Sequence, residues 1–452
     1  MIKQKQQSTL QLNQKTERFS SVGFIFAAIG SSVGLGNMWK FPYITGENGG
    51  AAFFLLFVVC LIVIGLPVLL AELAIGRSGR GSAATAFVRA GGGRAWKGAG
   101  LLQVLAPFLI LTFYIVVTGW TLHYALWAFN GNLFKSSDFA YQFSTFTSGY
   151  LPIVWQFISI VITGGVVILG VAKGIEKFNK ILIPGLVALL VILMVRAVTL
   201  PNANKGVSFF LNPDFSQLSA ESALVALGHA FFSLSLGMGI LLTYGSYVRK
   251  EQSLGTATLA IAAGDLVYAF IAGLIIFPTT FSFGIAPDQG PSLVFVALPA
   301  AFSAMPFGAM FGGLFFILLA FAALTSAVSV LEVPVSYVME RFSWSRPKSV
   351  IAVCAIIFVL GVPSALSFGA VPGFVIGGKS VFDWVDFITS NVMLPVGGLA
   401  VIVFAGYRWK RAAEATGLQA GWFKLWLFMI RYIAPVLMVL VLLHTTGILS
   451  FE

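Results

Sequence analysis

Long runs of apolar residues recur along the whole chain and are separated by short polar segments. Most runs reach about 18 residues or more, and about 20 residues of α-helix cross a hydrocarbon core of about 30 Å. The pattern therefore predicts an all-α membrane protein with eleven transmembrane helices. These cover residues 21–44, 51–76, 99–128, 152–171, 177–199, 221–248, 255–283, 308–339, 349–366, 383–407 and 423–447.

Composition argues against the soluble classes of protein. Hydrophobic residues make up 58% of the 452 positions and charged residues only 10%, whereas soluble domains carry about 25% charged residues. So few charges could not cover the surface of a soluble protein of this size. A soluble enzyme, a disordered chain and a nucleic-acid-binding module are therefore excluded as the leading interpretation, and no nucleic acid is expected as a partner.

The net charge of +11 is explained by where the basic residues lie. Of the 27 Lys and Arg residues, 21 lie in the amino-terminal segment and in alternate loops, and four lie in the opposite loops. Because cytoplasmic loops of membrane proteins carry the excess of Lys and Arg, we expect a multi-pass protein of the inner (plasma) membrane with a cytoplasmic amino terminus. Eleven helices then place the carboxyl terminus outside. The other two, Lys40 and Arg431, lie inside predicted helices, and the sequence assigns Arg431 no role.

One short motif occurs in the first predicted helix and again in the sixth. The segments Ser32–Gly36 and Ser235–Gly239 both read S-x-G-x-G, 203 residues apart. Matching Gly-interrupted helices in two halves indicate a binding site at the midplane of a secondary transporter, although two small-residue packing stripes are the competing interpretation. Because five helices is an odd number, the second set enters the membrane from the opposite side. We therefore divide the chain into a cytoplasmic tail (1–19), a first inverted repeat (20–200), a second inverted repeat (201–408) and a cytoplasmic loop with the eleventh helix (409–452).

Polar side chains inside the predicted helices are few, and each is costly in a bilayer. Their oxygen atoms are hard ligands that suit an alkali cation, and the sequence has no His and Cys cluster with the spacing of a transition-metal site. Carbonyl and N–H groups freed at helix breaks can bind Na⁺ and a carboxylate. A hydroxyl that bonds back to its own helix is the competing interpretation for Ser and Thr. These polar residues are Asn37, Glu72, Tyr114, Ser233, Ser235, Asp265, Thr325 and Ser326.

Several segments resemble one family of transporters. Gly30–Tyr43, which reads GSSVGLGNMWKFPY, and the following Glu47–Gly50 resemble the first helix of the neurotransmitter:sodium symporters. Pro67–Arg77 is similar to their second helix, and Ser233–Gly237 with Ser246–Lys250 is similar to their sixth. The resemblance extends from about residue 20 to 440 and is greatest to bacterial eleven-helix members that carry hydrophobic amino acids.

The resemblance implies an amino-acid site and two Na⁺ sites at the helix breaks. The first Na⁺ would also contact the substrate carboxylate, and the apolar walls of the substrate site favour a hydrophobic side chain. The implied Na⁺ ligands are Ser32, Asn37, Ser233 and Asp265 at the first site, and Gly30, Val33, Ala322, Thr325 and Ser326 at the second. The implied substrate residues are Ser32, Leu35, Gly36, Ile110, Tyr114, Phe232, Ser233, Ser235, Met238, Ser326 and Val330.

The resemblance also implies gates and moving parts. Lys40 and Asp386 would close the outer vestibule across a water-filled gap. Lysine stands where the family usually has arginine, and lysine cannot make the bidentate fork with a carboxylate. On the inner side, Glu340 would close the path with Lys15 or Arg18. Three further residues are structural: Glu72 would support the unwound backbone of the sixth helix, and the inner end of the fifth helix, between Gly174 and Pro184, would unwind during release.

Together these features predict a Na⁺-coupled symporter that imports hydrophobic L-amino acids by alternating access, with no enzyme chemistry. Transport is expected to be independent of chloride. Chloride-dependent relatives have Ser, Tyr and Gln where this chain has Ala269, Phe57 and His229, and they have Asn where it has Asp265. The alternatives are an amino-acid channel, which needs a continuous pore, and a non-transporting membrane receptor. The sequence also has no Walker motif of a primary pump.

Overall fold

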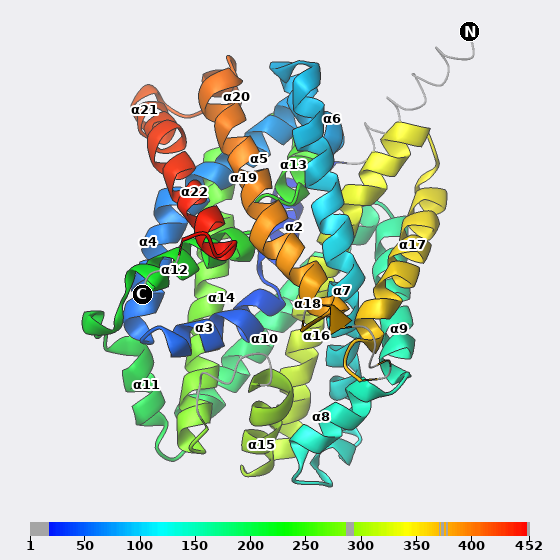
Figure 1. The fold of residues 1–452 in the computed structure, drawn as a ribbon, viewed down its shortest axis with the longest axis vertical. Helices are drawn as coiled ribbons and strands as arrows, with labels where there is room; N and C mark the ends of the chain where they lie inside the picture. Colours follow the sequence, from blue (N-terminus) through cyan, green and yellow to red (C-terminus); the bar gives the residue numbers. More distant parts are fainter. Residues whose placement is uncertain (1–17, 286–292, 370, 372–374, 377, 450–452) are drawn as a thin grey trace.

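The computed structural model describes residues 18–285, 293–369, 371, 375–376 and 378–449, and these are almost entirely helical (Figure 1). One antiparallel pair of two-residue strands, β1 (Val375–Ile376) and β2 (Lys379–Ser380), is the exception within these ranges. Nine helices of the described chain are long and apolar enough to cross a membrane, and a bent pair of helices raises the number to ten. The fold class predicted from the apolar runs is therefore confirmed.

The helices follow the predicted spans closely, and we number the spans 1 to 11 in chain order. Span 1 is the bent pair, in which α2 (Ser21–Ser32) and Gly36–Glu47 meet at 43°. Span 6 consists of two shorter helices, α12 (Ala220–Ser233) and α13 (Ile240–Tyr247), and this eleventh span is compatible with the predicted count. Spans 2–5 and 7–11 are Ala51–Gly79, Arg94–Phe129, Leu151–Ile168, Val171–Val198, Leu254–Ser282, Gly308–Phe342, Arg346–Leu366, Val381–Arg408 and Ala420–Thr445.

Most spans contain more than one helical element. The α-helices are α3 (Phe41–Glu47) in span 1, α4 (Ala51–Cys60) and α5 (Leu66–Gly79) in span 2, α7 (Lys97–Phe129), α9 (Leu151–Ile168), α10 (Lys177–Val198), α14 (Leu254–Ser282), α16 (Gly308–Phe342), α17 (Arg346–Leu366), α18 (Val381–Asp386) and α19 (Leu394–Val403) in span 10, and α21 (Ala420–Phe428) and α22 (Ala434–Thr445) in span 11. Spans 1, 2, 5, 10 and 11 also contain π-helical turns, which are Gly36–Lys40, Leu61–Gly65, Val171–Glu176, Phe387–Met393, Phe404–Arg408 and Met429–Ile433.

Short helices outside the spans were not predicted, because they lack the long apolar run of a membrane helix. At one end of the molecule lie α6 (Ala83–Phe87) and α20 (Ala412–Thr416). At the opposite end lie α8 (Phe139–Ser148), α11 (Ala203–Leu211) and α15 (Leu298–Ser303) (Figure 1). These helices cover the ends of the bundle.

The two broken spans run in opposite directions through the bundle. Figure 1 shows α2 and α13 in the half that contains α6, and α3 and α12 in the other half. Span 1 thus enters from the side from which span 6 leaves, as the inverted arrangement requires. The centre of the bundle holds span 8, whose apolar window is 83% buried, whereas the window of span 11 is only 28% buried. Span 8 packs against α7, and the breaks of spans 1 and 6 lie beside it.

Candidate substrate and sodium site

The break in span 1 begins where α2 ends at Ser32. Val33 leaves helical geometry with a ψ of 87°, and its N–H makes the last helical bond, to the carbonyl of Ile29. Gly34 is required beyond the break, because an added Cβ would lie 2.6 Å from the hydroxyl oxygen of Ser326 on span 8. The unwound backbone therefore packs directly against span 8.

The break in span 6 is longer. Ser235, Gly237 and Gly239 have positive φ angles of 56°, 77° and 71°, which L-residues other than glycine rarely adopt. A Cβ at Gly237 would lie 2.3 Å from the carbonyl oxygen of Leu394, so the close approach also requires glycine. The strained Ser235 is held by its hydroxyl, which donates to the carbonyl of Ser31 over 3.0 Å. This bond joins the two breaks.

A buried carboxylate supports the unwound part of span 6. Glu72 on α5 is fully buried, and its Oε1 accepts a hydrogen bond of 2.7 Å from the N–H of Gly237. The family resemblance implied that Glu72, on span 2, would lie beside the unwound backbone of the sixth helix, and the structure places it there. A charged or neutral carboxyl there satisfies a donor that the broken helix has released.

The first cluster of predicted Na⁺ ligands comes from three different spans. Asp265 on α14 is fully buried, and the side-chain amide of Asn37 donates to its Oδ1 over 2.8 Å. The hydroxyl of Ser233 lies 2.7 and 2.8 Å from the two carboxylate oxygens, and 3.3 Å from the amide oxygen of Asn37. Amide, hydroxyl and carboxylate oxygens thus lie within hydrogen-bonding distance of one another beside both breaks. Hard cations prefer oxygen ligands of these types.

The second cluster lies between α2 and α16. The hydroxyl of Ser326 lies 3.3 Å from the carbonyl oxygens of Gly30 and Ser31. Thr325 donates to the carbonyls of Phe321 and Ala322, which belong to its own helix, over 3.0 Å each. The hydroxyl of Ser32 likewise bonds back to Ala28 over 3.3 Å. The self-bonding interpretation of these hydroxyls is therefore seen for Thr325 and Ser32, whereas Ser326 bridges two spans.

The sequence did not predict the role of Asn179 at this second cluster. Its Oδ1 lies 2.0 Å from the position that a Cβ at Gly30 would take. This oxygen is buried and accepts no hydrogen bond among the described residues. The amide of Asn179 donates instead to the carbonyl of Ile175. Lys177 and Lys180 flank Asn179, so it does not stand out in the sequence as an isolated polar residue of an apolar run.

The predicted substrate residues surround the same two breaks. The hydroxyl of Tyr114 on α7 approaches Ser326 and the backbone of Leu35, but it completes no hydrogen bond within the described ranges. A Cβ at Gly36 would lie 2.7 Å from the ring of Phe232, so this ring lies against the unwound chain. The apolar residues Ile110, Met238 and Val330 are buried. The phenol of Tyr114 and the unwound backbone of span 1 thus lie close to one another, and the other predicted substrate residues add buried apolar side chains.

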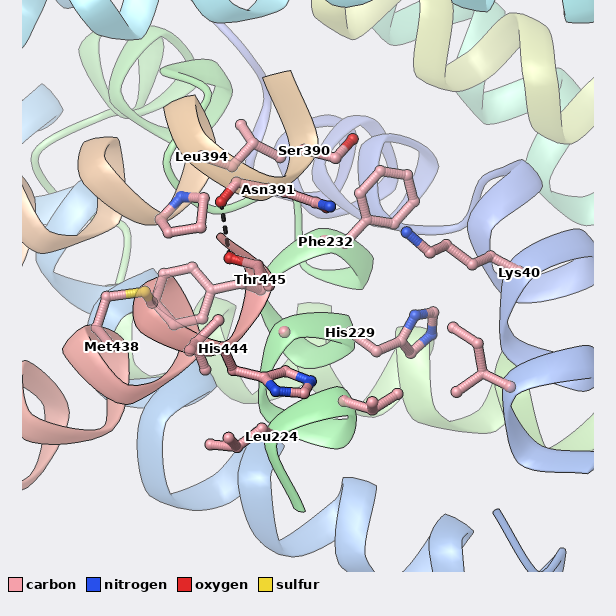
Figure 2. A pocket seen from close by; sticks show the side chains of 16 residues that line it. Lys40, Leu224, His229, Phe232, Ser390, Asn391, Leu394, Met438, His444 and Thr445 are labelled. Atoms are coloured by element: carbon pink, nitrogen blue, oxygen red, sulfur yellow. Dashed lines mark hydrogen bonds between the residues drawn. The ribbon is translucent and has the colours of Figure 1, made fainter. Parts of the chain in front are cut away.

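A cavity of about 320 Å³ lies between spans 1, 6, 10 and 11 (Figure 2). Lys40 enters it from span 1, with its Nζ 5.0 Å from the centre of the Phe232 ring. Asp386 accepts a hydrogen bond of 2.7 Å from Ser390, which also lines the cavity. No ion pair between Lys40 and Asp386 occurs in the described part of the chain, so the outer gate stays a prediction.

His229 lines the same cavity and is almost completely buried. Its ring stacks on that of Phe41, with the centroids 5.5 Å apart, and lies 5.4 Å from the ring of Phe57. Neither of its ring nitrogens has a hydrogen-bond partner among the described residues. His229 therefore packs among aromatic rings, and the described residues give it no hydrogen bond.

At the end of the bundle that contains α6, Glu340 has partners that the sequence did not predict. It pairs with Arg89, and its Oε2 accepts a hydrogen bond of 2.7 Å from the N–H of Ser82. Lys15 lies outside the described residues, and no ion pair joins Arg18 to Glu340 within them. The proposed contact between Glu340 and the amino terminus therefore stays untested, while the contact with Arg89 ties span 8 to the segment after span 2.

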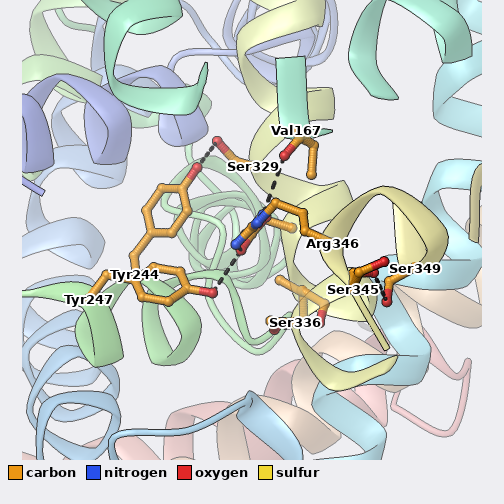
Figure 3. Close-up of polar contacts among 10 residues, drawn as sticks. Val167, Tyr244, Tyr247, Ser329, Ser336, Ser345, Arg346 and Ser349 are labelled. Atoms are coloured by element: carbon orange, nitrogen blue, oxygen red, sulfur yellow. Dashed lines mark hydrogen bonds and ion pairs between the residues drawn. The ribbon is translucent and has the colours of Figure 1, made fainter. Parts of the chain in front are cut away.

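A buried ion pair lies at the same end of the bundle and was not predicted from the sequence (Figure 3). The guanidinium of Arg346 makes two hydrogen bonds to Glu332, of 2.7 and 3.1 Å, and the Tyr247 hydroxyl donates to the same carboxylate over 2.7 Å. Glu332 is fully buried and Arg346 is 7% exposed. An acid inside the apolar span 8, with a base at the start of span 9, was the signal for this pair.

Comparisons with known proteins agree with this arrangement. The profile of the sodium:neurotransmitter symporter family matches residues 16–145 and 137–451. The chain is 38% identical over 441 residues to the uncharacterized sodium-dependent transporter YhdH of Bacillus subtilis (strain 168), covering 96% of this chain and 98% of that protein. It is 34% identical over 447 residues to an uncharacterized sodium-dependent transporter of Haemophilus influenzae, covering 95% of this chain and 98% of the relative.

Among solved structures, the crystal structure of MhsT in complex with L-phenylalanine is similar, with a TM-score of 0.88 and 46% identity. The match covers 95% of this chain and 99% of MhsT. Helix breaks, buried polar clusters and similarity along nearly the full length lead to one conclusion: the chain belongs to the sodium:neurotransmitter symporter family.

Proposed function

We propose that this multi-pass membrane protein is a Na⁺-coupled symporter that imports hydrophobic L-amino acids by alternating access. The observation that carries the proposal is the meeting of Asn37, Ser233 and Asp265 beside two broken helices. A substrate carboxylate bound next to these oxygens would be attracted by a Na⁺ ion there, because opposite unit charges about 4 Å apart gain roughly 4 kcal/mol even at an effective dielectric constant of 20. Binding of ion and substrate would then be coupled directly.

The substrate class follows from the surroundings of the breaks. Tyr114 and the free backbone at Leu35 offer donors for a carboxylate, while Ile110, Met238 and Val330 offer apolar contact. MhsT, with 46% identity, was crystallised with L-phenylalanine. These observations support an amino acid with an apolar or aromatic side chain.

A second Na⁺ is proposed between Gly30, Val33, Ala322, Thr325 and Ser326. Its support is the approach of Ser326 to the end of α2, which places hydroxyl and carbonyl oxygens of two spans together. We further propose that residues 20–200 and 201–408 move as inverted repeats around these sites, with the amino terminus in the cytoplasm of the cell and the protein in its inner (plasma) membrane.

The test is uptake of radiolabelled L-phenylalanine into proteoliposomes that contain the purified full-length protein. We expect saturable uptake with an inward Na⁺ gradient and almost none with K⁺ in place of Na⁺. Tyr114→Phe, which removes only the hydroxyl, should raise the KM for the amino acid. Non-saturable flux would favour a channel, and binding without any uptake would favour a receptor.

A further inference from the structure

Arg431, to which the sequence assigns no role, lies where spans 10 and 11 meet. It stands in the π-helical turn Met429–Ile433, and its Nε donates to the carbonyl of Gly406 over 2.5 Å. Gly406 lies two residues before the end of span 10, where carbonyls have no donor within their own helix. Arg431 thus caps the carboxyl end of span 10, and its positive charge is attracted to the negative end of that helix dipole.

The contact fixes the guanidinium close to the end of span 10. A Cβ at Gly406 would lie 3.2 Å from Cγ of Arg431, which leaves little free space between the two spans. Tyr407 donates its hydroxyl to the backbone carbonyl of Arg431. Span 10 ends at Arg408, two residues after Gly406, whereas Arg431 lies well inside the apolar segment of span 11, which begins at Ala420.

Two residues next to Arg431, one in the structure and one in the sequence, are exposed, and Arg408, which follows its partner Tyr407, adds a second positive charge at the end of span 10. Tyr407 and Tyr432 are each 60% exposed, and Arg408 is exposed. We call Tyr407, Arg408, Arg431 and Tyr432 the arginine surface. Within the described residues, no acidic side chain pairs with either arginine. A guanidinium inside a membrane span is costly unless it is paired, and Arg431 lies inside span 11.

We propose that the arginine surface binds the phosphate of an anionic phospholipid. The chemistry of recognition is a phosphate anion, for which arginine provides several parallel donors. A lipid is favoured over free phosphate because span 11 is largely exposed on its outer face, where Phe428 is 51% exposed and in ring contact with Tyr432. An acyl chain could lie along these aromatic faces, and basic pockets between spans on the cytoplasmic side are typical lipid headgroup sites.

The experiment is native mass spectrometry of the purified full-length protein after removal of lipid. Dioleoyl phosphatidylglycerol and dioleoyl phosphatidylcholine are titrated separately, since they share acyl chains and differ in net charge. We expect phosphatidylglycerol to bind more tightly. Arg431→Gln should weaken its binding about fivefold, because one basic residue near an anionic lipid contributes about 1 kcal/mol and about 1.4 kcal/mol is tenfold. The matched control is Arg341→Gln, on the same side of the membrane but outside the arginine surface, and it should have no effect.

Arg408→Gln provides a second variant that leaves the bond between Arg431 and Gly406 intact. It should weaken phosphatidylglycerol binding to a similar extent even if Arg431→Gln fails to fold. Equal affinity of wild type and both variants would overturn the proposal, as would equal binding of the two lipids by the wild type. Displacement of phosphatidylglycerol by millimolar inorganic phosphate would show a site for the free anion and would overturn the assignment to a lipid.

Discussion

The carboxylate of Glu176 caps the first helix of the bundle by bonding to Ser20. The N–H of Ser20 donates to Oε2 over 2.9 Å, and its hydroxyl donates to Oε1 over 2.6 Å. Ser20 is itself the N-cap residue of α2. A Cβ at Gly23 would lie 2.0 Å from the carboxyl carbon of Glu176, so glycine allows the carboxylate to reach the helix end. Glu176 therefore ties the inner half of broken span 1 to the start of span 5.

Loss of this charge should free the inner half of span 1. Hydrogen bonds to a charged group each contribute about 1.5–3 kcal/mol, and Glu176→Gln keeps only a weaker acceptor. We expect inward opening to become about tenfold more frequent, since about 1.4 kcal/mol is tenfold. The measurement is the rate at which bound L-phenylalanine leaves the purified protein. The control is Lys180→Gln, which removes a partly exposed partner of Glu176 but preserves both bonds from Ser20. Identical release rates for wild type and Glu176→Gln would contradict this role.

Span 5 should unwind at the same end. Gly174 lies in the π-helical turn Val171–Glu176, and Pro184 lies inside α10. Proline lacks an N–H donor and clashes with the preceding turn, so it weakens the helix between these two residues. Pro184→Ala should slow transport several-fold and leave equilibrium binding of substrate nearly unchanged. The transport rate is measured by counterflow in proteoliposomes, and equilibrium substrate binding is measured separately in detergent. Unchanged turnover in Pro184→Ala would remove the support for unwinding.

Glycine 174 is less suitable for this test. A Cβ there would lie 2.1 Å from the carbonyl oxygen of Val166, so Gly174→Ala would disturb the packing of the turn as well as its flexibility. A change in transport in that variant would not separate the two effects, whereas Pro184 has a side chain that alanine replaces without added volume.

The sequence predicted the spans well because the length of an apolar run decides whether a helix can cross a membrane. An apolar run long enough to cross the membrane is visible in the sequence, and all nine long helices coincide with predicted spans. The break at Ser235–Gly239 was also visible, because repeated glycines mark backbone that helical geometry does not hold. The short helices α8 and α11 lack a long apolar run, and only local features mark them, such as the N-cap Asp138 of α8, whose side chain accepts a hydrogen bond from the N–H of Tyr141.

The polar contacts between spans were only partly predictable. Asn37 and Asp265 were identified because each is an isolated polar residue in an apolar run, and the structure brings them within 2.8 Å. The pairing of Glu340 with Arg89 depends on how span 8 packs against the segment after span 2, about which local sequence says nothing. Glu332 was missed although it carried the same signal as Asp265.

Sodium should be required for substrate binding itself. Asn37→Ala removes the amide oxygen and nitrogen next to Asp265, and Thr325→Ala removes a hydroxyl beside the proposed second site. Each should raise the Na⁺ concentration that gives half-maximal substrate binding, measured by scintillation proximity in mixed Na⁺ and K⁺ buffers. Thr163→Ala is a suitable control, because the Thr163 hydroxyl bonds only within α9, to the carbonyl of Ser159. Equal substrate binding by the wild type in Na⁺ and in K⁺ would refute the coupling scheme.

Removing only one partner of the buried pair of Glu332 and Arg346 should destabilise the fold, because the remaining charge is left buried and unpaired. Removing one partner of such a pair costs about 3–5 kcal/mol, whereas replacing both is far less harmful. Arg346→Gln should therefore lower the thermal unfolding temperature in detergent more than the double variant with Glu332→Gln. Transport assays of the double variant then test whether the pair also limits inward opening. A double variant less stable than Arg346→Gln would contradict the unpaired-charge argument.

Transport should not require chloride, because the surroundings of the proposed first Na⁺ site offer few donors for an anion. Ala269 and Phe57 are buried and have no polar side-chain atoms, and His229 is stacked between aromatic rings. Asp265 lies one helical turn before Ala269 and is bonded to Asn37 and Ser233. Two cations in a membrane protein need negative charge close by, and this carboxylate is placed to supply it permanently.

The test is uptake with chloride replaced by gluconate at constant Na⁺, in wild type and in Asp265→Asn. Wild-type uptake should be the same in both media, because a unit negative charge about 4 Å from Na⁺ provides roughly 4 kcal/mol at an effective dielectric constant of 20 without any bound anion. Asp265→Asn keeps the size of the side chain but loses the charge, so its uptake in gluconate should fall at least about tenfold. Loss of wild-type uptake without chloride would show that an external anion is needed. Full activity of Asp265→Asn in gluconate would show that another group balances the charge of Na⁺.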